Sequence, residues 1–109
     1  MADRPRPLPA RHELPSVDAA ALEAARHADR LLEAARELGR DRWRRFLEPL
    51  PDRLRDDGLR ELRATALRCR AAYGPKDSVR DELPAELTEP FLRAVDRLIR
   101  ELNRLDVGG

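Results

Sequence analysis

The residue types that most often carry enzymatic chemistry are few and isolated in this sequence. Cys69 is the single cysteine, and the only histidines are His12 and His27. Nucleophilic catalysis needs a nucleophile within reach of a base, and Cys69 falls in an apolar helical pattern, where burial makes a thiol unreactive. A di-metal site in a helical bundle needs a Glu-x-x-His pair, which neither histidine provides. The sequence therefore predicts no catalytic residue, no metal site, no cofactor and no small-molecule substrate.

Arginine is the remaining group with a chemistry of its own. The chain has 22 basic and 21 acidic residues, and residues 39–76 hold a surplus of about five positive charges, whereas residues 77–106 carry a net charge of about −3. Arginine side chains neutralise phosphates, and an aromatic ring such as Trp43 can stack on a base. One hypothesis is therefore a nucleic-acid-binding surface. Its phosphate contacts would come from Arg42, Arg44, Arg45, Arg60, Arg63 and Arg70.

The same region also permits a helix-turn-helix-like arrangement. Residues 50–57 would form a short first helix and Gly58 the turn, so that the next helix would present Arg60 and Arg63 to the major groove. Acidic residues interleaved with these arginines would repel phosphate, and arginine is the default polar residue throughout the chain. Nucleic-acid binding is therefore the alternative and not the leading interpretation.

Leucine and alanine patterns predict the elements that would position these residues. β-branched residues are scarce, which argues against strands, while Leu, Ala, Arg and Glu favour helix. Apolar residues alternately four and three positions apart predict amphipathic helices over about 17–38, 59–73 and 89–105, with Ser16 and Thr88 as N-caps. Prolines and glycines leave room only for short turns between them. We therefore predict an all-α protein, a small helical bundle of three main amphipathic helices with short helical turns between them.

Proline content divides the chain. Four prolines within residues 1–15 predict a disordered arm, followed by a helical bundle domain over 16–106 and a frayed tail over 107–109. No apolar run is long enough for a membrane helix, and the N-terminal residues lack the hydrophobic region of a secretion signal, so we expect neither. The single cysteine fits a reducing compartment, so we expect a cytoplasmic protein with no membrane partner.

The helix over 17–38 suggests how such a protein would act. Its stripe of alanines allows another helix to approach closely, either from the same bundle or from another chain. We predict a non-catalytic accessory or adaptor protein that works by protein–protein association, with self-association as the commonest outcome. The predicted contact residues lie on this stripe and in the aromatic segment after it. They are Ala21, Ala24, Ala28, Leu31, Trp43, Phe46 and Leu50.

Overall fold

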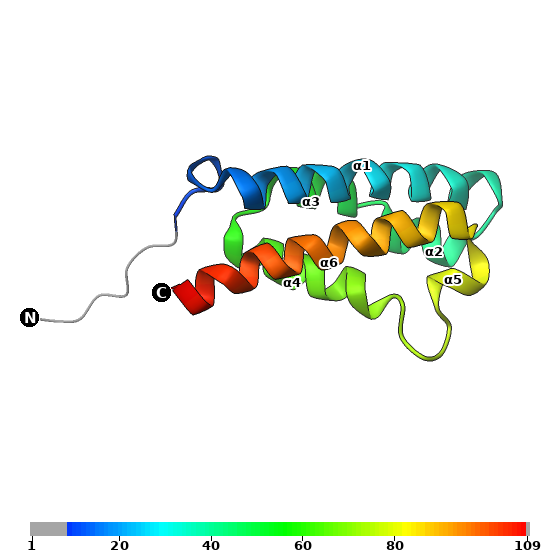
Figure 1. Ribbon diagram of the computed structural model, residues 1–109. Helices are drawn as coiled ribbons and strands as arrows, with labels where there is room; N and C mark the ends of the chain where they lie inside the picture. The colour runs from blue at the N-terminus through cyan, green and yellow to red at the C-terminus, as the bar shows by residue number, and fades with distance from the viewer. Residues whose placement is uncertain (1–8, 109) are drawn as a thin grey trace, which may run out of the picture.

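The computed structural model describes residues 9–108, and every regular element among them is helical (Figure 1). The elements are the 3₁₀ turn η1 (Arg11–Glu13) and the α-helices α1 (Pro15–Glu37), α2 (Asp41–Leu47), α3 (Leu50–Asp56), α4 (Leu59–Ala71), α5 (Val79–Glu82) and α6 (Ala85–Gly108). The predicted all-α class is confirmed. The predicted count of three main helices is matched only in part, because the short helices α2 and α3 also bury leucines in the core.

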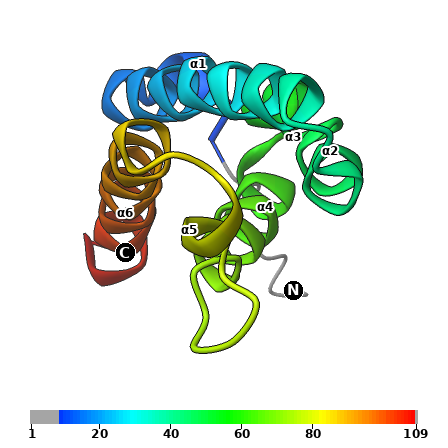
Figure 2. The ribbon, with the colours of Figure 1, turned by 90° about the vertical axis from the view of Figure 1, so that its right-hand side faces the viewer.

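Helix α1 is the element around which the others pack. Helix α6 runs along one side of α1, while α2 and α3 cover another side. Helix α4 packs against both α6 and α3, opposite α1, as the end-on view in Figure 2 shows. The core therefore lies between α1, α3, α4 and α6, and α6 has two flanks, one facing α1 and one facing α4.

Small side chains on α1 and large ones on α6 build the most extensive interface. Seven alanines of α1 are buried, most of them completely. From α6, the bundle core receives Phe91, Val95, Leu98 and Leu102. Alanine has the highest helix propensity and keeps neighbouring backbones close. The alanine stripe of α1 is therefore occupied within the chain.

Two predicted N-caps are wrong because tertiary contacts move the starts of the helices. Helix α1 begins at Pro15, whose missing N–H costs nothing in a first turn, and Ser16 does not cap it. Helix α6 begins at Ala85, so Thr88 lies inside the helix and is fully buried. Gly39, at φ +67°, ends α1 as predicted, since glycine adopts this left-handed conformation without strain.

The segment before α1 differs from the disordered arm expected over residues 1–15, of which residues 1–8 lie outside the described part. The side chain of Arg11 is only 10% exposed, ion-pairs with Asp18 at 3.0 Å and donates to the carbonyl of Asp57 at 3.0 Å. These contacts attach η1 to the bundle. At the other end, α6 continues to Gly108, into the frayed tail expected over 107–109, and residue 109 lies outside the described part.

Candidate functional site

The apolar residues predicted to contact a partner lie inside the protein. Six of the seven are buried: Ala21, Ala24, Ala28, Leu31, Trp43 and Leu50. The remaining one, Phe46, is half-buried and packs against the core. The predicted partner surface is therefore corrected to a part of the core, because the surrounding helices of the same chain cover the alanine stripe.

Trp43 also fails as a platform for stacking a base. The residue is 5% exposed, and its ring meets that of Phe46 edge to face, with 5.6 Å between ring centroids. The guanidinium carbon of Arg42 lies 5.0 Å from the ring centroid, a cation–π contact. The rings of Trp43 and Phe46 therefore pack together at α2 and are not available for stacking.

The six arginines predicted for nucleic-acid binding are divided between α2 and α4, and half of them are held by neighbours. On α2, Arg44 donates to Glu48 at 3.0 Å. On α4, Arg63 donates to the carbonyl of Leu102, and Arg70 ion-pairs with an aspartate of α6. Arg42, Arg45 and Arg60 remain exposed. The predicted helix-turn-helix pair is present as α3 and α4, but Arg63, expected to face DNA, points toward α6.

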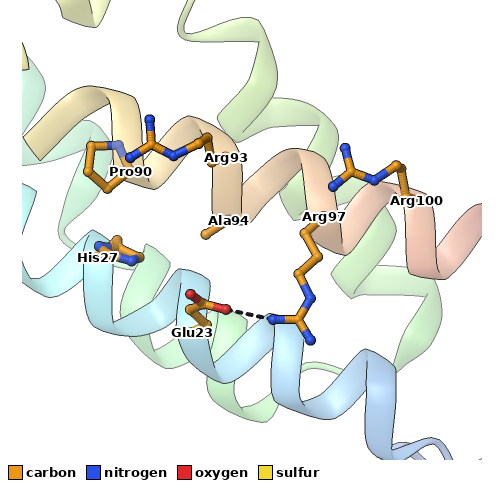
Figure 3. A pocket seen from close by; sticks show the side chains of 7 residues that line it. All are labelled: Glu23, His27, Pro90, Arg93, Ala94, Arg97 and Arg100. Carbon is orange, nitrogen blue, oxygen red and sulfur yellow. Dashed lines mark hydrogen bonds and ion pairs between the residues drawn. The ribbon is translucent and has the colours of Figure 1, made fainter.

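A different surface brings cationic side chains together, between α1 and α6. A groove of about 400 Å³ lies there (Figure 3). Its lining consists of Glu23 and His27 from α1, and of Pro90, Arg93, Ala94, Arg97 and Arg100 from α6. We call it the arginine groove. Pro90 and Ala94 supply apolar surface between the charged side chains.

The spacing of arginines along α6 explains why they meet in this groove. Arg93, Arg97 and Arg100 are four and three positions apart, which places them on one stripe of a helix. This signal is readable in the sequence. The charge summed over residues 77–106 does not show it, since eight acidic residues against five basic ones give that region a negative total.

The arginines of the groove differ in their partners. Arg97 donates to the carboxylate of Glu23 at 2.8 Å, as Figure 3 shows. Arg93 and Arg100 form neither a hydrogen bond nor an ion pair with any residue that the structure describes. Two guanidinium groups are therefore left to hold an oxyanion from outside, and planar guanidinium binds carboxylate or phosphate with two parallel hydrogen bonds.

His27 reports the electrostatic field in the groove. Partial burial lowers the pKa of this imidazole, and the positive charges of Arg30, Arg26 and Arg93 lower it further, against an opposing effect of Glu23. Like charges disfavour the protonated form. The lowered pKa favours the neutral imidazole, and the charged groups that act on it are three arginines against one carboxylate, Glu23.

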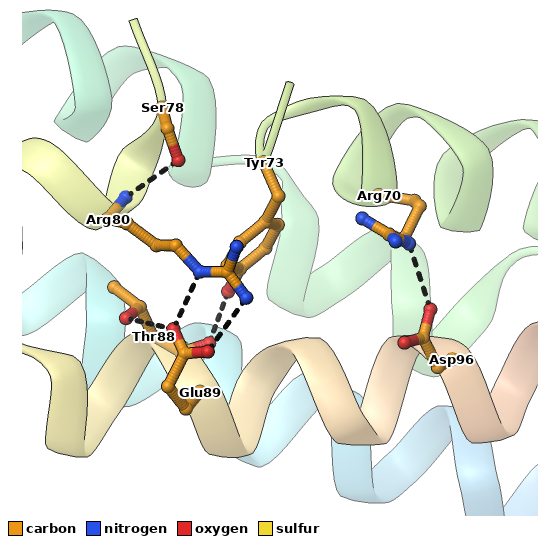
Figure 4. A network of polar contacts seen from close by, with 7 residues as sticks. All are labelled: Arg70, Tyr73, Ser78, Arg80, Thr88, Glu89 and Asp96. Atoms are coloured by element: carbon orange, nitrogen blue, oxygen red, sulfur yellow. Dashed lines mark hydrogen bonds and ion pairs between the residues drawn. The ribbon is translucent and has the colours of Figure 1, made fainter. Parts of the chain in front are cut away.

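The opposite flank of α6 carries a polar network in which every member has a partner (Figure 4). Arg80 donates to both carboxylate oxygens of Glu89, at 3.0 and 2.8 Å, and lies over the ring of Tyr73. The hydroxyl of Tyr73 donates to the backbone carbonyl of Thr88. This network fastens the segment after α4 to the first turns of α6, which is a structural role.

Cys69 is not among the residues that line the arginine groove. The thiol of Cys69 is buried on α4, and burial raises its pKa to about 12, so it is not a nucleophile at neutral pH. Within residues 9–108, no group of three or more His, Cys, Asp or Glu side chains is placed to hold a metal ion. Nor is any helix in this range both long enough and apolar enough to span a bilayer. What the groove offers chemically is the binding of an anion.

The interpretation of the groove rests on its own geometry. Comparison of the chain with protein families, with curated proteins and with solved structures finds no match in any of the three.

Proposed function

We propose that this protein is a non-catalytic helical module that acts by association with a protein partner, whose acidic side chains bind in the arginine groove. One observation carries the proposal. Arg93 and Arg100 present guanidinium groups with no hydrogen-bond or ion-pair partner among the described residues, on either side of Arg97. Complementary charge both steers association and selects the partner.

The groove favours carboxylates of a protein over the phosphates of a nucleic acid. Glu23, which lines the groove, repels a continuous phosphate backbone but already shows that a carboxylate fits against Arg97. Pro90 and Ala94 offer apolar contact to aliphatic side chains. The net charge of the whole chain is only +1, which gives little general attraction for nucleic acid. Nucleic-acid binding is kept as an outcome of the test.

Self-association takes a different form in this proposal from the one that the alanine stripe suggested. That stripe is buried within a single chain, so a second copy would have to bring acidic residues to the groove instead. Light scattering at tens of micromolar protein measures the oligomeric state, and we expect a monomer in the absence of a partner. We place the protein in the cytoplasm, where its single cysteine stays reduced, and assign it no cofactor.

Binding of two polyanions tests the proposal. Poly-L-glutamate and a single-stranded oligonucleotide of equal charge are titrated at low salt into wild type and into Arg93→Gln/Arg100→Gln. Each exposed ion pair is worth about 0.2–1 kcal/mol, so we expect the double variant, which loses two of them, to bind poly-L-glutamate roughly two- to thirtyfold more weakly.

The matched control is Arg60→Gln/Arg68→Gln, which removes the same charge from exposed positions of α4. We expect it to bind poly-L-glutamate almost as well as wild type. Equal losses in the two double variants would mean that only net charge matters, which contradicts a site in the groove. Preference of the wild type for the oligonucleotide would favour the nucleic-acid alternative.

A further inference from the structure

Glu23 is the one acidic residue among those that line the arginine groove. Its carboxylate is bound to Arg97, the middle of the three groove arginines. The pair is accessible, because the side chain of Glu23 is 36% exposed and that of Arg97 is 47% exposed. An ion pair of this exposure is weak and exchanges its carboxylate readily for another. The arginine groove is therefore partly occupied by the protein itself.

We infer that Glu23 is an internal placeholder, which an acidic partner segment displaces from Arg97 when it binds. This inference rests on the proposed function and adds to it the class of partner and the event that accompanies binding. The occupant is a protein segment with at least three carboxylates, of which the outer two bind Arg93 and Arg100. The third then takes the place of Glu23 on Arg97.

The arrangement of the arginines makes this exchange favourable. Arg93 and Arg100 stand seven residues apart on α6, about 10 Å along the helix axis, and Arg97 lies between them. Two turns of an acidic helix, with carboxylates at the same spacing, would match this length. Once the outer two arginines are bound, the third carboxylate is held near Arg97 at high effective concentration. A single free carboxylate has no such advantage over Glu23, so the groove selects for multivalent acidic ligands.

Removal of the placeholder is the direct test. Glu23→Gln keeps the size of the side chain but frees Arg97 from its charged partner. Glu33→Gln is the matched control, since Glu33 lies on the same helix, is exposed and is not part of the groove lining. Both variants raise the net charge by one, so the difference between them isolates the position. With poly-L-glutamate as probe at low salt, we expect Glu23→Gln to bind two- to fivefold more tightly than Glu33→Gln.

The outcomes separate this inference from the proposed function. Equal affinities of Glu23→Gln and Glu33→Gln would overturn the placeholder, even if Arg93→Gln/Arg100→Gln still weakened binding and so supported the groove. If wild type does not bind poly-L-glutamate at all, both the placeholder inference and the proposed function fail. A larger gain for the oligonucleotide than for poly-L-glutamate in Glu23→Gln would assign the occupant to phosphate polymers and overturn the acidic protein segment.

A spectroscopic readout follows the exchange in the wild-type protein. The side-chain Nε–H signal of Arg97 and the carboxyl carbon of Glu23 are observed by NMR during the titration with poly-L-glutamate. We expect the carboxyl signal of Glu23 to move to the position it has when Arg97 is replaced by Gln, because the carboxylate becomes solvated. An unmoved Glu23 signal at saturation would show that the ligand binds without displacing it.

Discussion

Arginine side chains lie on both flanks of α6, but acidic residues balance their charge on one flank and not on the other. On the flank that faces α4, arginines of other segments bind acidic residues of α6, as Arg80 binds Glu89 and Arg70 binds Asp96. On the flank that faces α1, the arginines belong to α6 itself, and Glu23 is the one residue of α1, among those the structure describes, that forms an ion pair with one of them. Charge is balanced on the first flank and in excess on the second.

This difference distinguishes a structural interface from a candidate binding surface. Matched charges at an internal interface satisfy one another and leave little for a ligand to gain. Excess charge of one sign, held on a rigid helix beside a groove, destabilises the free protein slightly through mutual repulsion and is relieved when an opposite charge arrives. We therefore propose that the α4 flank serves folding and that the α1 flank serves recognition.

The largest effect that tests this assignment is expected at Tyr73, on the structural flank. Tyr73→Ala removes a buried ring that Arg80 covers, and we expect it to lower the free energy of unfolding by about 3 kcal/mol. Tyr73→Phe removes only the hydroxyl that donates to Thr88 and should cost about 1 kcal/mol. Urea denaturation measures both, with Leu22→Ala at a partly exposed position of α1 as control. Costs no larger than that of the control would show that the network is dispensable.

A smaller effect compares one arginine from each flank. Arg70→Gln removes an exposed ion pair with Asp96 and should lower stability by about 0.2–1 kcal/mol. Arg93→Gln should change stability little, because Arg93 is repelled by Arg97 one helical turn away but attracted by Glu89 one turn away in the other direction. Thermal and urea unfolding of the two variants give the comparison. If Arg93→Gln is the more destabilising of the two, Arg93 is a structural residue and the division between the flanks fails.

The smallest effect is a change in the pKa of His27, which is lowered in the wild-type protein. Nearby positive charge contributes to this shift, so Arg93→Gln should raise the pKa of His27, and Glu23→Gln should lower it further. An NMR pH titration of the imidazole measures both, with Arg68→Gln on α4 as a control that should leave it unchanged. Opposite changes in the pKa of His27 in Arg93→Gln and Glu23→Gln would support this electrostatic description of the groove. A change in the same direction in both variants would contradict it.

The main helices could be predicted from the sequence because their apolar spacing is regular. The start of α6 could not be predicted, because proline usually occurs in the first turn of a helix, which Pro90 would occupy if Thr88 were the N-cap. In the folded protein, Leu87 and Thr88 are drawn into the core, and the carbonyl of Thr88 accepts the hydroxyl of Tyr73. Contacts between distant residues thus extend the helix beyond the boundary that local preference indicates.

The candidate site could be predicted only in part. The spacing of the arginines on α6 is visible in the sequence, but their neighbour is not, because Glu23 and Arg97 are 74 positions apart in the chain. The reverse holds for the alanine stripe of α1. Its periodicity predicts a helix–helix contact surface, but nothing in the sequence specifies whether the second helix belongs to the same chain.

The alanine stripe has a consequence for how firmly the groove is shaped. Alanine has no side-chain torsions to immobilise, so burying Ala24 and Ala28 against the bundle costs no side-chain conformational entropy. On the α1 side of its contact with α6, these alanines also have no alternative rotamers to adopt. Glu23 and His27 are therefore held on a stiff scaffold at a fixed distance from α6, and a ligand that enters meets a preorganised set of charges.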